Sequence, residues 1–167
     1  MSDGPRHATL EALRAEFDSA FAARRTVPPA ETALLAIRIG AAPYAVRLLE
    51  AGGLATAPRI VPVPSRRREL LGVAGLRGEV VPVYSLARIV LGADDGEPPR
   101  WLVLARGEER LALAFAHLDG RLVARTSALR PVVAGAAGSP HADAIHPGPP
   151  GRPVLALGAI AAALRAS

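Results

Sequence analysis

The sequence predicts a mainly β protein built from small barrels, with a few short helices. Apolar segments of strand length alternate with glycine- and proline-containing turns at a spacing of roughly 8 to 12 residues. Hydrophobic residues make up 50% of the chain but aromatic residues only 4%, so the core must consist of valine, leucine, isoleucine and alanine. The length of 167 residues suits one domain with an appendage and is too short for two ordinary enzyme domains.

The composition of the chain argues against several classes of function. The formal net charge is +5, and all 20 basic residues are arginines. These arginines are scattered and aromatic residues are scarce, so no basic face with base-stacking side chains is expected, and we predict no nucleic-acid partner. The chain has no cysteine, which excludes disulfides and thiolate chemistry. It has neither a signal-type leader nor an apolar run approaching the roughly 18 residues of a spanning helix, so we expect a soluble cytoplasmic protein without direct membrane insertion.

The N-terminal segment, residues 1–30, is predicted to hold an amphipathic helix over 8–25 and a proline-containing linker. Its apolar residues are spaced three and four apart, as on one face of a helix. They are Leu10, Leu13, Phe17 and Phe21. Pro28 and Pro29 prevent the helix from continuing. The stripe either packs on the chain's own domain, predicted for residues 31–167, or serves as a docking helix for a partner.

Period-two patterns begin at Thr32 and predict a first hairpin from residues 33–39 and 44–48. Glycines and prolines then divide residues 48–64 into short extended pieces. A short helix is predicted over 66–71, since Ser65 is a suitable N-cap and Gly72 a suitable C-terminal stop. Its three consecutive arginines, residues 66–68, are interpreted as a solvated face, with a role towards phosphate or an acidic partner left open.

The central stretch predicts two strands, 70–76 and 79–85, joined at Arg77 and Gly78. A short helix over 86–92 follows, with Ser85 placed to cap its first turn. The remaining predicted elements are a hairpin from 101–105 and 111–118, an extended segment 121–129, a long irregular connection 131–153, a last strand 154–158 and a C-terminal helix 159–166.

No arrangement of catalytic residues stands out. The sequence holds no nucleophile motif, phosphate-binding glycine loop or zinc-protease motif. His141, Asp143 and His146 have ligand-like spacing, but they fall in the predicted irregular connection, so no metal site is predicted. Adjacent carboxylates at 94–95 and 108–109 are interpreted as solvated loop charge. We therefore predict a protein that is not an enzyme and uses no cofactor.

Residues 69–92, ELLGVAGLRGEVVPVYSLARIVLG, resemble the signature segment of CheW-like coupling domains. That family carries the pattern G-x-x-x-[LN]-R-G-x-x-x-P-x-x-D-L. The residues that fit it here are Gly72, Leu76, Arg77, Gly78, Pro82 and Leu86. Other apolar segments follow in the family's order, so the resemblance covers about residues 31–165.

The resemblance implies two interlocked five-stranded SH3-like barrels that share a hydrophobic interface. It also implies a non-enzymatic adaptor that couples chemoreceptors to the chemotaxis histidine kinase, with the kinase regulatory domain and the receptor's cytoplasmic tip as partners. Arg77 would lie at a tight turn with its guanidinium free to bind a carboxylate, although a purely structural role is an equal alternative. The partner-binding residues implied are Leu48, Leu54, Gly75, Leu76, Arg77, Gly78 and Glu79.

The chain departs from the family pattern at three positions that are usually acidic, which here hold Ser85, Ala116 and Ala156. The region after Glu50 reads AGGL where valine and glutamate are common. If those acidic side chains engage the kinase or the receptor, coupling would be weakened. The alternative hypothesis is therefore a diverged interaction or assembly module of another bacterial motility or signalling system.

Overall fold

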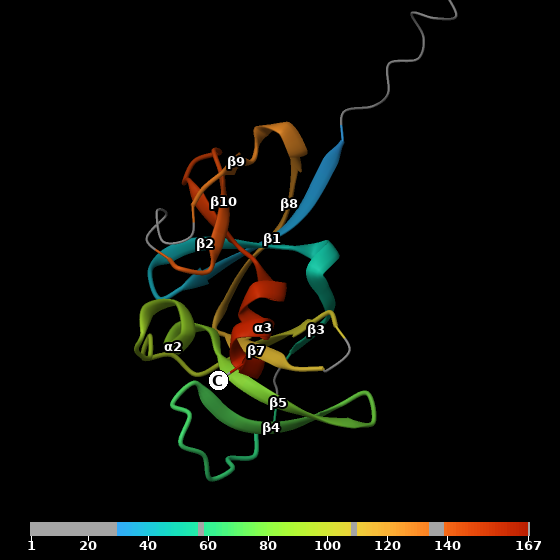
Figure 1. The fold of residues 1–167 in the computed structure, drawn as a ribbon, viewed down its shortest axis with the longest axis vertical. Helices are drawn as coiled ribbons and strands as arrows, with labels where there is room; N and C mark the ends of the chain where they lie inside the picture. Colours follow the sequence, from blue (N-terminus) through green and yellow to red (C-terminus); the bar gives the residue numbers. More distant parts are fainter. Residues whose placement is uncertain (1–29, 57–58, 108–109, 134–138, 167) are drawn as a thin grey trace, which may run out of the picture.

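A computed structural model describes residues 30–56, 59–107, 110–133 and 139–166. Figure 1 shows two sheets, one above the other, with a helix between them. The predicted N-terminal helix, with Leu10, Leu13, Phe17 and Phe21, lies outside the described residues. Among those residues no helix is long and apolar enough to cross a membrane.

The first sheet has six strands in the order β8-β1-β2-β11-β10-β9. Its strands are β1 (Glu31–Ile39), β2 (Ala42–Arg47), β8 (His117–Arg125), β9 (Arg130–Pro131), β10 (Ala142–His146) and β11 (Arg152–Leu155). All neighbouring pairs are antiparallel except β11 with β2, which is parallel. The sixth strand, β9, contributes only two residues.

The second sheet has five strands in the order β3-β6-β7-β5-β4. Its strands are β3 (Ala51–Thr56), β4 (Leu70–Leu76), β5 (Glu79–Ser85), β6 (Trp101–Ala105) and β7 (Ala112–Phe115). The chain enters this sheet after β2 and returns to the first sheet at β8, so the second sheet is inserted within the first. The pair of β5 with β7 is parallel and the other pairs are antiparallel.

Three apolar clusters explain the predicted two-barrel architecture. A small cluster around Leu34 and Val154 fills the interior of the barrel formed by the first sheet. Another small cluster, around Val81 and Leu102, fills the interior of the barrel formed by the second sheet. The largest cluster lies between the sheets, where Leu113 packs with residues of both. Strands such as β7 are buried on both faces, which is why they are apolar without interruption. The mainly β prediction is confirmed.

Two helices and two 3-10 turns complete the described chain. They are η1 (Leu48–Glu50), α2 (Leu86–Leu91), η2 (Thr126–Ala128) and α3 (Leu157–Ala166). α2 begins as predicted, because Ser85 Oγ accepts a hydrogen bond from the Arg88 amide at 3.2 Å. α3 lies between the sheets in Figure 1 and buries Leu157 and Ile160 in the large cluster.

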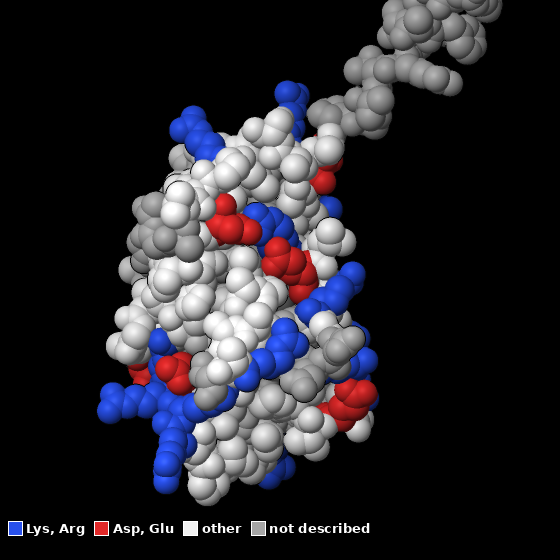
Figure 2. Space-filling view, viewed as in Figure 1, with Lys and Arg blue, Asp and Glu red and all other residues white. Residues whose placement is uncertain are grey.

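The helix predicted over 66–71 is wrong. The Glu69 carbonyl accepts a hydrogen bond from the Ser85 amide at 2.7 Å, and β4 begins at the next residue. Ser65 caps only a local turn through the Arg67 amide at 3.0 Å. The Arg67 guanidinium donates to the Leu164 carbonyl near the end of α3. Figure 2 shows basic side chains gathered at the lower left, where this loop lies. The role of the arginines 66–68 towards phosphate or an acidic partner stays open.

The irregular connection predicted over 131–153 is also wrong in part, because it contains β10 and the start of β11. Ala142 is buried in the large cluster between the sheets, and Ala144 in the small cluster of the first sheet. Because these buried side chains are only methyl groups, the apolar pattern of this strand is weak in the sequence. His141 directly precedes β10, and Asp143 and His146 lie within it. No group of three potential metal ligands occurs among the described residues.

Candidate partner-binding surface

Arg77 and Gly78 form the two-residue turn between β4 and β5. Both have positive φ, 51° and 83°, as type I′ hairpin turns require at their two central positions. Glycine adopts such angles freely, whereas Arg77 is the one described non-glycine residue with positive φ. The turn therefore fixes an arginine at the exposed tip of the hairpin, as the sequence predicted.

The outward face of this hairpin is apolar and only partly covered by the described residues. Val73 pairs with Pro82, and Gly75 pairs with Val80, while Ala74 and Val81 face the barrel interior. Val61 forms an isolated bridge to Val73 and extends the row. Val80 is 75% exposed and Val61 52%. These five residues, Val61, Val73, Gly75, Val80 and Pro82, are called the hairpin surface below.

Gly72 allows the segment around Val61 to lie against β4. Its φ is 148°, and a Cβ atom built there would lie 2.1 Å from the Val61 carbonyl oxygen. Val61 and Val73 exchange backbone hydrogen bonds of 2.8 and 2.9 Å beside this contact. A glycine at position 72 is therefore a steric requirement of the hairpin surface.

Pro82 interrupts no sheet hydrogen bonding between β5 and β7. The pairing of these strands begins one residue later, where Val83 faces Ala112. A proline without an N–H group is tolerated just outside such a ladder. Its ring is thus available to the outward face.

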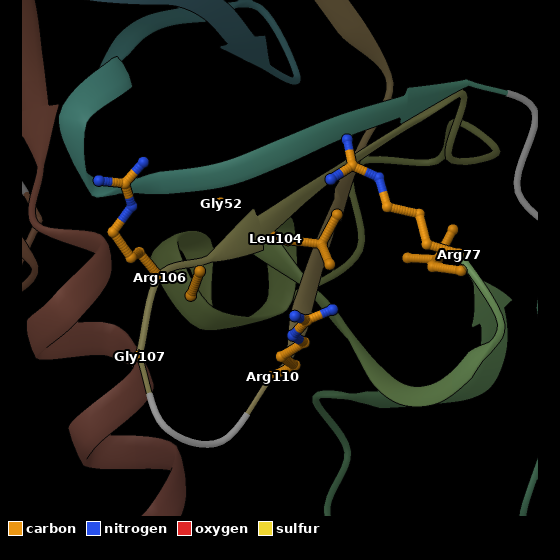
Figure 3. Close-up of a pocket in the computed structure, with 8 residues that line it drawn as sticks. Gly52, Arg77, Leu104, Arg106, Gly107 and Arg110 are labelled. Atoms are coloured by element: carbon orange, nitrogen blue, oxygen red, sulfur yellow. The ribbon is translucent and has the colours of Figure 1, made fainter.

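A cavity of about 170 Å³ lies beside the hairpin tip (Figure 3). Three arginines line it, Arg77 from the β4–β5 turn and Arg106 and Arg110 from the β6–β7 connection. The Arg77 guanidinium reaches across to β3, where its Nη2 lies 3.3 Å from the Cβ position of Gly53. The absence of a side chain at Gly53 makes room for this guanidinium.

Five of the seven predicted partner-binding residues lie together on the hairpin: Gly75, Leu76, Arg77, Gly78 and Glu79. Gly75 faces open space, whereas Leu76 is half-buried against the barrel interior. Glu79 forms an ion pair with Arg110 at 2.9 Å, and both side chains are 53% exposed.

The other two predicted residues lie elsewhere. Leu54 is on β3, directly after Gly53, and is 40% exposed. Leu48 lies in η1, where it packs against the large cluster between the sheets and not on the hairpin surface. Of the hairpin surface, sequence reasoning predicted only Gly75 and missed the other four residues, although the alternation over 79–85 could have identified Val80 and Pro82 as outward.

The three neutral positions that are usually acidic do not lie on the hairpin surface. Ser85 and Ala116 are buried, and Ser85 keeps a capping role. Ala156 precedes α3, and its carbonyl accepts the first helical hydrogen bond, from Ile160, at 3.1 Å. Its methyl side chain cannot accept a hydrogen bond and so cannot cap the helix, but the carboxylate of Glu50 accepts from the Gly158 amide at 3.4 Å.

Asp119 binds two arginines that hold the first sheet together. Its carboxylate accepts from Arg38 Nε at 2.9 Å and from Arg152 Nη2 at 2.8 Å. Arg152 Nη1 also donates to the backbone carbonyls of Ile37 and Tyr44. Burial opposes ionisation of Asp119, but the hydrogen bonds and charges of the two arginines outweigh it and lower its pKa. This network is structural and lies outside the hairpin surface.

Comparisons with known proteins agree with this architecture. The model of a protein family described as the CheW-like domain matches residues 33–157. The fold is similar to that of scaffolding protein TtCheW from Thermoanaerobacter tengcongensis, with a TM-score of 0.65 at 11% identity over 76% of this chain and 90% of that chain. No curated protein matches the sequence. The match over most of the described chain, together with this two-barrel fold, shows that the chain belongs to the CheW-like domain family, a family of chemotaxis scaffold and adaptor proteins.

Proposed function

We propose that this chain is a non-enzymatic cytoplasmic adaptor that couples chemoreceptors to a chemotaxis histidine kinase. Its partners are the regulatory domain of the kinase and the cytoplasmic tip of the receptor. Membership of the CheW-like family supports the adaptor class. The observation that carries the proposal is the hairpin surface, where Val80 and Val61 are exposed beside the arginine at the hairpin tip.

Physical chemistry favours this surface as a docking site. Contiguous apolar side chains on a rigid sheet lose unfavourable contact with water when a partner covers them, at about 25 cal/mol per Å² of apolar area. Val80 pairs with the bare backbone of Gly75, so a partner side chain can lie directly against the strand. The charged tip adds orientation, because a guanidinium binds a carboxylate with two parallel hydrogen bonds.

The cavity beside the hairpin supports binding in preference to catalysis. Its lining consists of arginine, leucine, alanine and glycine residues. None of these supplies a nucleophile or a general base of ordinary pKa. The site therefore suits recognition of another protein.

The test replaces Val80 by aspartate in the full-length chain and measures binding to purified kinase regulatory domain and receptor tip by titration calorimetry. A charge in the centre of an apolar contact should weaken binding to at least one fragment by about tenfold, or about 1.4 kcal/mol. The matched control is Val123→Asp, which places the same charge at a valine 47% exposed on β8 of the other sheet.

The proposal predicts that the control binds both fragments within about twofold of the wild type, and that both variants keep the wild-type circular dichroism spectrum. Equal binding by the Val80 variant would contradict the placement of the site. A wild-type chain that binds neither fragment would contradict kinase coupling and favour the alternative of a diverged module in another motility or signalling system. In that alternative the predicted helix with Leu10, Leu13, Phe17 and Phe21 would be the docking element.

A further inference from the structure

One end of the first sheet has an apolar face that continues beyond its cover. Ala33 of β1 pairs with Val123 of β8, so their side chains lie on the same face of the sheet. Leu35 lies two residues further along β1 and therefore on the same face, where it is buried in the large cluster between the sheets. Val123 is instead 47% exposed. The face that is covered at Leu35 is thus open at Val123 among the described residues.

An exposed leucine lies at the same end of this sheet. Leu34 of β1 pairs with Arg47, the last residue of β2, and η1 follows directly and contacts β1. Leu49 of η1 is 77% exposed, although the residue before it packs against the large cluster. Exposed apolar side chains gathered at one end of a sheet favour cover by another segment. Three residues, Ala33, Leu49 and Val123, are called the strand-end surface below.

The described chain begins at this same end of the sheet. Glu31, the first residue of β1, pairs with Arg125, so Val123 lies two residues away along β8. Figure 1 shows the start of β1 at the end of the molecule opposite β4, which carries part of the hairpin surface. The predicted linker, residues 26–30, spans at most about 17 Å when fully extended. A segment that precedes this linker is therefore held near the strand-end surface.

We propose that the helix predicted over residues 8–25 docks on the strand-end surface of its own chain. A helix of this length is marginal in water, so its apolar stripe requires an apolar surface. Phe17 and Phe21 are the stripe residues nearest to the linker, and they would lie against Ala33 and Val123. The helix would thus cover the chain's own domain, and the hairpin surface would remain free for the partners of the proposed function.

Charges on β8 favour the same placement. Arg121 and Arg125 lie on the face of Val123, two residues to either side of it, and both are exposed. Within the part of the chain that the structure describes, neither guanidinium has an ion-pair or hydrogen-bond partner. Two carboxylates, at positions 16 and 18, directly flank Phe17 in the sequence. With Phe17 against Val123, these carboxylates would lie beside the two arginines.

The test uses the absence of cysteine, because a single introduced thiol then reports on a single position. It measures the rate at which dithionitrobenzoate labels the full-length Val123→Cys variant. Adding Phe17→Asp with Phe21→Asp should raise this rate at least about tenfold, because charges in the stripe oppose its burial and release the helix. The matched control adds Ala15→Asp with Ala22→Asp, which lie on the opposite side of the predicted helix. This control should keep the rate within about twofold.

A thiol on the hairpin surface shows whether the protection is specific to the strand-end surface. Val80 is 75% exposed, and labelling of the Val80→Cys variant should change by less than about twofold when Phe17→Asp and Phe21→Asp are added. An equal rise at positions 80 and 123 would overturn the placement of the helix. No rise at position 123, or an equal rise in the control with the altered alanines, would overturn the docking itself.

Dilution distinguishes the chain's own helix from that of a second copy. Docking within one chain predicts a labelling rate at position 123 that does not depend on protein concentration, and a monomer mass by light scattering. Protection that is lost on dilution would assign the strand-end surface to a second copy and overturn the inference. Val123→Asp alone alters one of several contacts, so it should leave the helix docked in most molecules. The labelling assay contains no kinase or receptor fragment, so its failure is distinguishable from failure of the proposed function.

Discussion

Replacing Gly72 by alanine should separate the segment around Val61 from β4. The added Cβ would lie 2.1 Å from the Val61 carbonyl oxygen and 2.9 Å from the Cα atom of Pro62. Both neighbours are backbone atoms, so no side-chain rotation relieves the contact. The segment must retreat until the contact exceeds 3.4 Å, the start of the ordinary range.

The retreat has a definable cost. It breaks the two hydrogen bonds between Val61 and Val73, of 2.8 and 2.9 Å, and each contributes about 1 kcal/mol. The φ of 148° adds roughly 1 kcal/mol of strain for a residue with a Cβ atom. Together these terms lower the free energy of unfolding by about 3 kcal/mol, or roughly 6–12 °C in Tm for a domain of this size.

Urea denaturation followed by circular dichroism measures this change, and Gly75→Ala is the matched control. Gly75 lies three residues further along β4, and its Cβ position contacts nothing within 4 Å. The control should stay within about 0.5 kcal/mol of the wild type. A Gly72 variant as stable as that control would refute the steric argument. Because the retreat also removes Val61 from the hairpin surface, the Gly72 variant should bind partner fragments more weakly even below its unfolding temperature.

Two other predictions concern helix capping and acid stability. Ala156→Asn should stabilise the protein by about 1 kcal/mol in urea denaturation by capping α3. Glu50→Ala, which removes the acceptor of the Gly158 amide, should cost less in that background than in the wild type, and additive effects would show that Glu50 is not a cap. Asp119 has a lowered pKa in the folded state, so its stabilising contribution is complete above about pH 4 and is lost as the pH falls through the folded pKa. Asp119→Asn should therefore flatten the decline in unfolding free energy below about pH 4, and an unchanged acid profile would contradict this assignment.

The central hairpin could be predicted because its signals are local. Alternation over 70–76 and 79–85, with the turn at Arg77 and Gly78, determines which residues pair. Ser85 as the cap of α2 is likewise a short-range pattern. The basic cavity could not be predicted in this way. Arg77 and Arg106 are far apart in the sequence, and only the sheet order brings their turns together.

The two wrong predictions have a common physical origin. Over 66–71, helix-forming residues and a capping serine gave a consistent local signal, but the Glu69 carbonyl is used in pairing with Ser85. Over 131–153, glycines and prolines masked a strand whose buried residues are alanines. In both cases a partner distant in the sequence decides the structure, and tertiary pairing overrides local propensity.

The parallel pairing of β2 with β11 has a consequence for synthesis on the ribosome. β3 to β7 follow one another along the chain, so the second sheet can complete its pairing as soon as those strands emerge. β2 cannot complete its pairing until β11 has been synthesised, because Val154 of β11 pairs with Ala45 of β2. All strands of the second sheet lie between these two residues in the sequence. Until then the nascent chain presents an unpaired apolar strand edge, the kind of surface that recruits other chains. The first sheet is therefore the last to close and the most exposed to aggregation while the protein is being made.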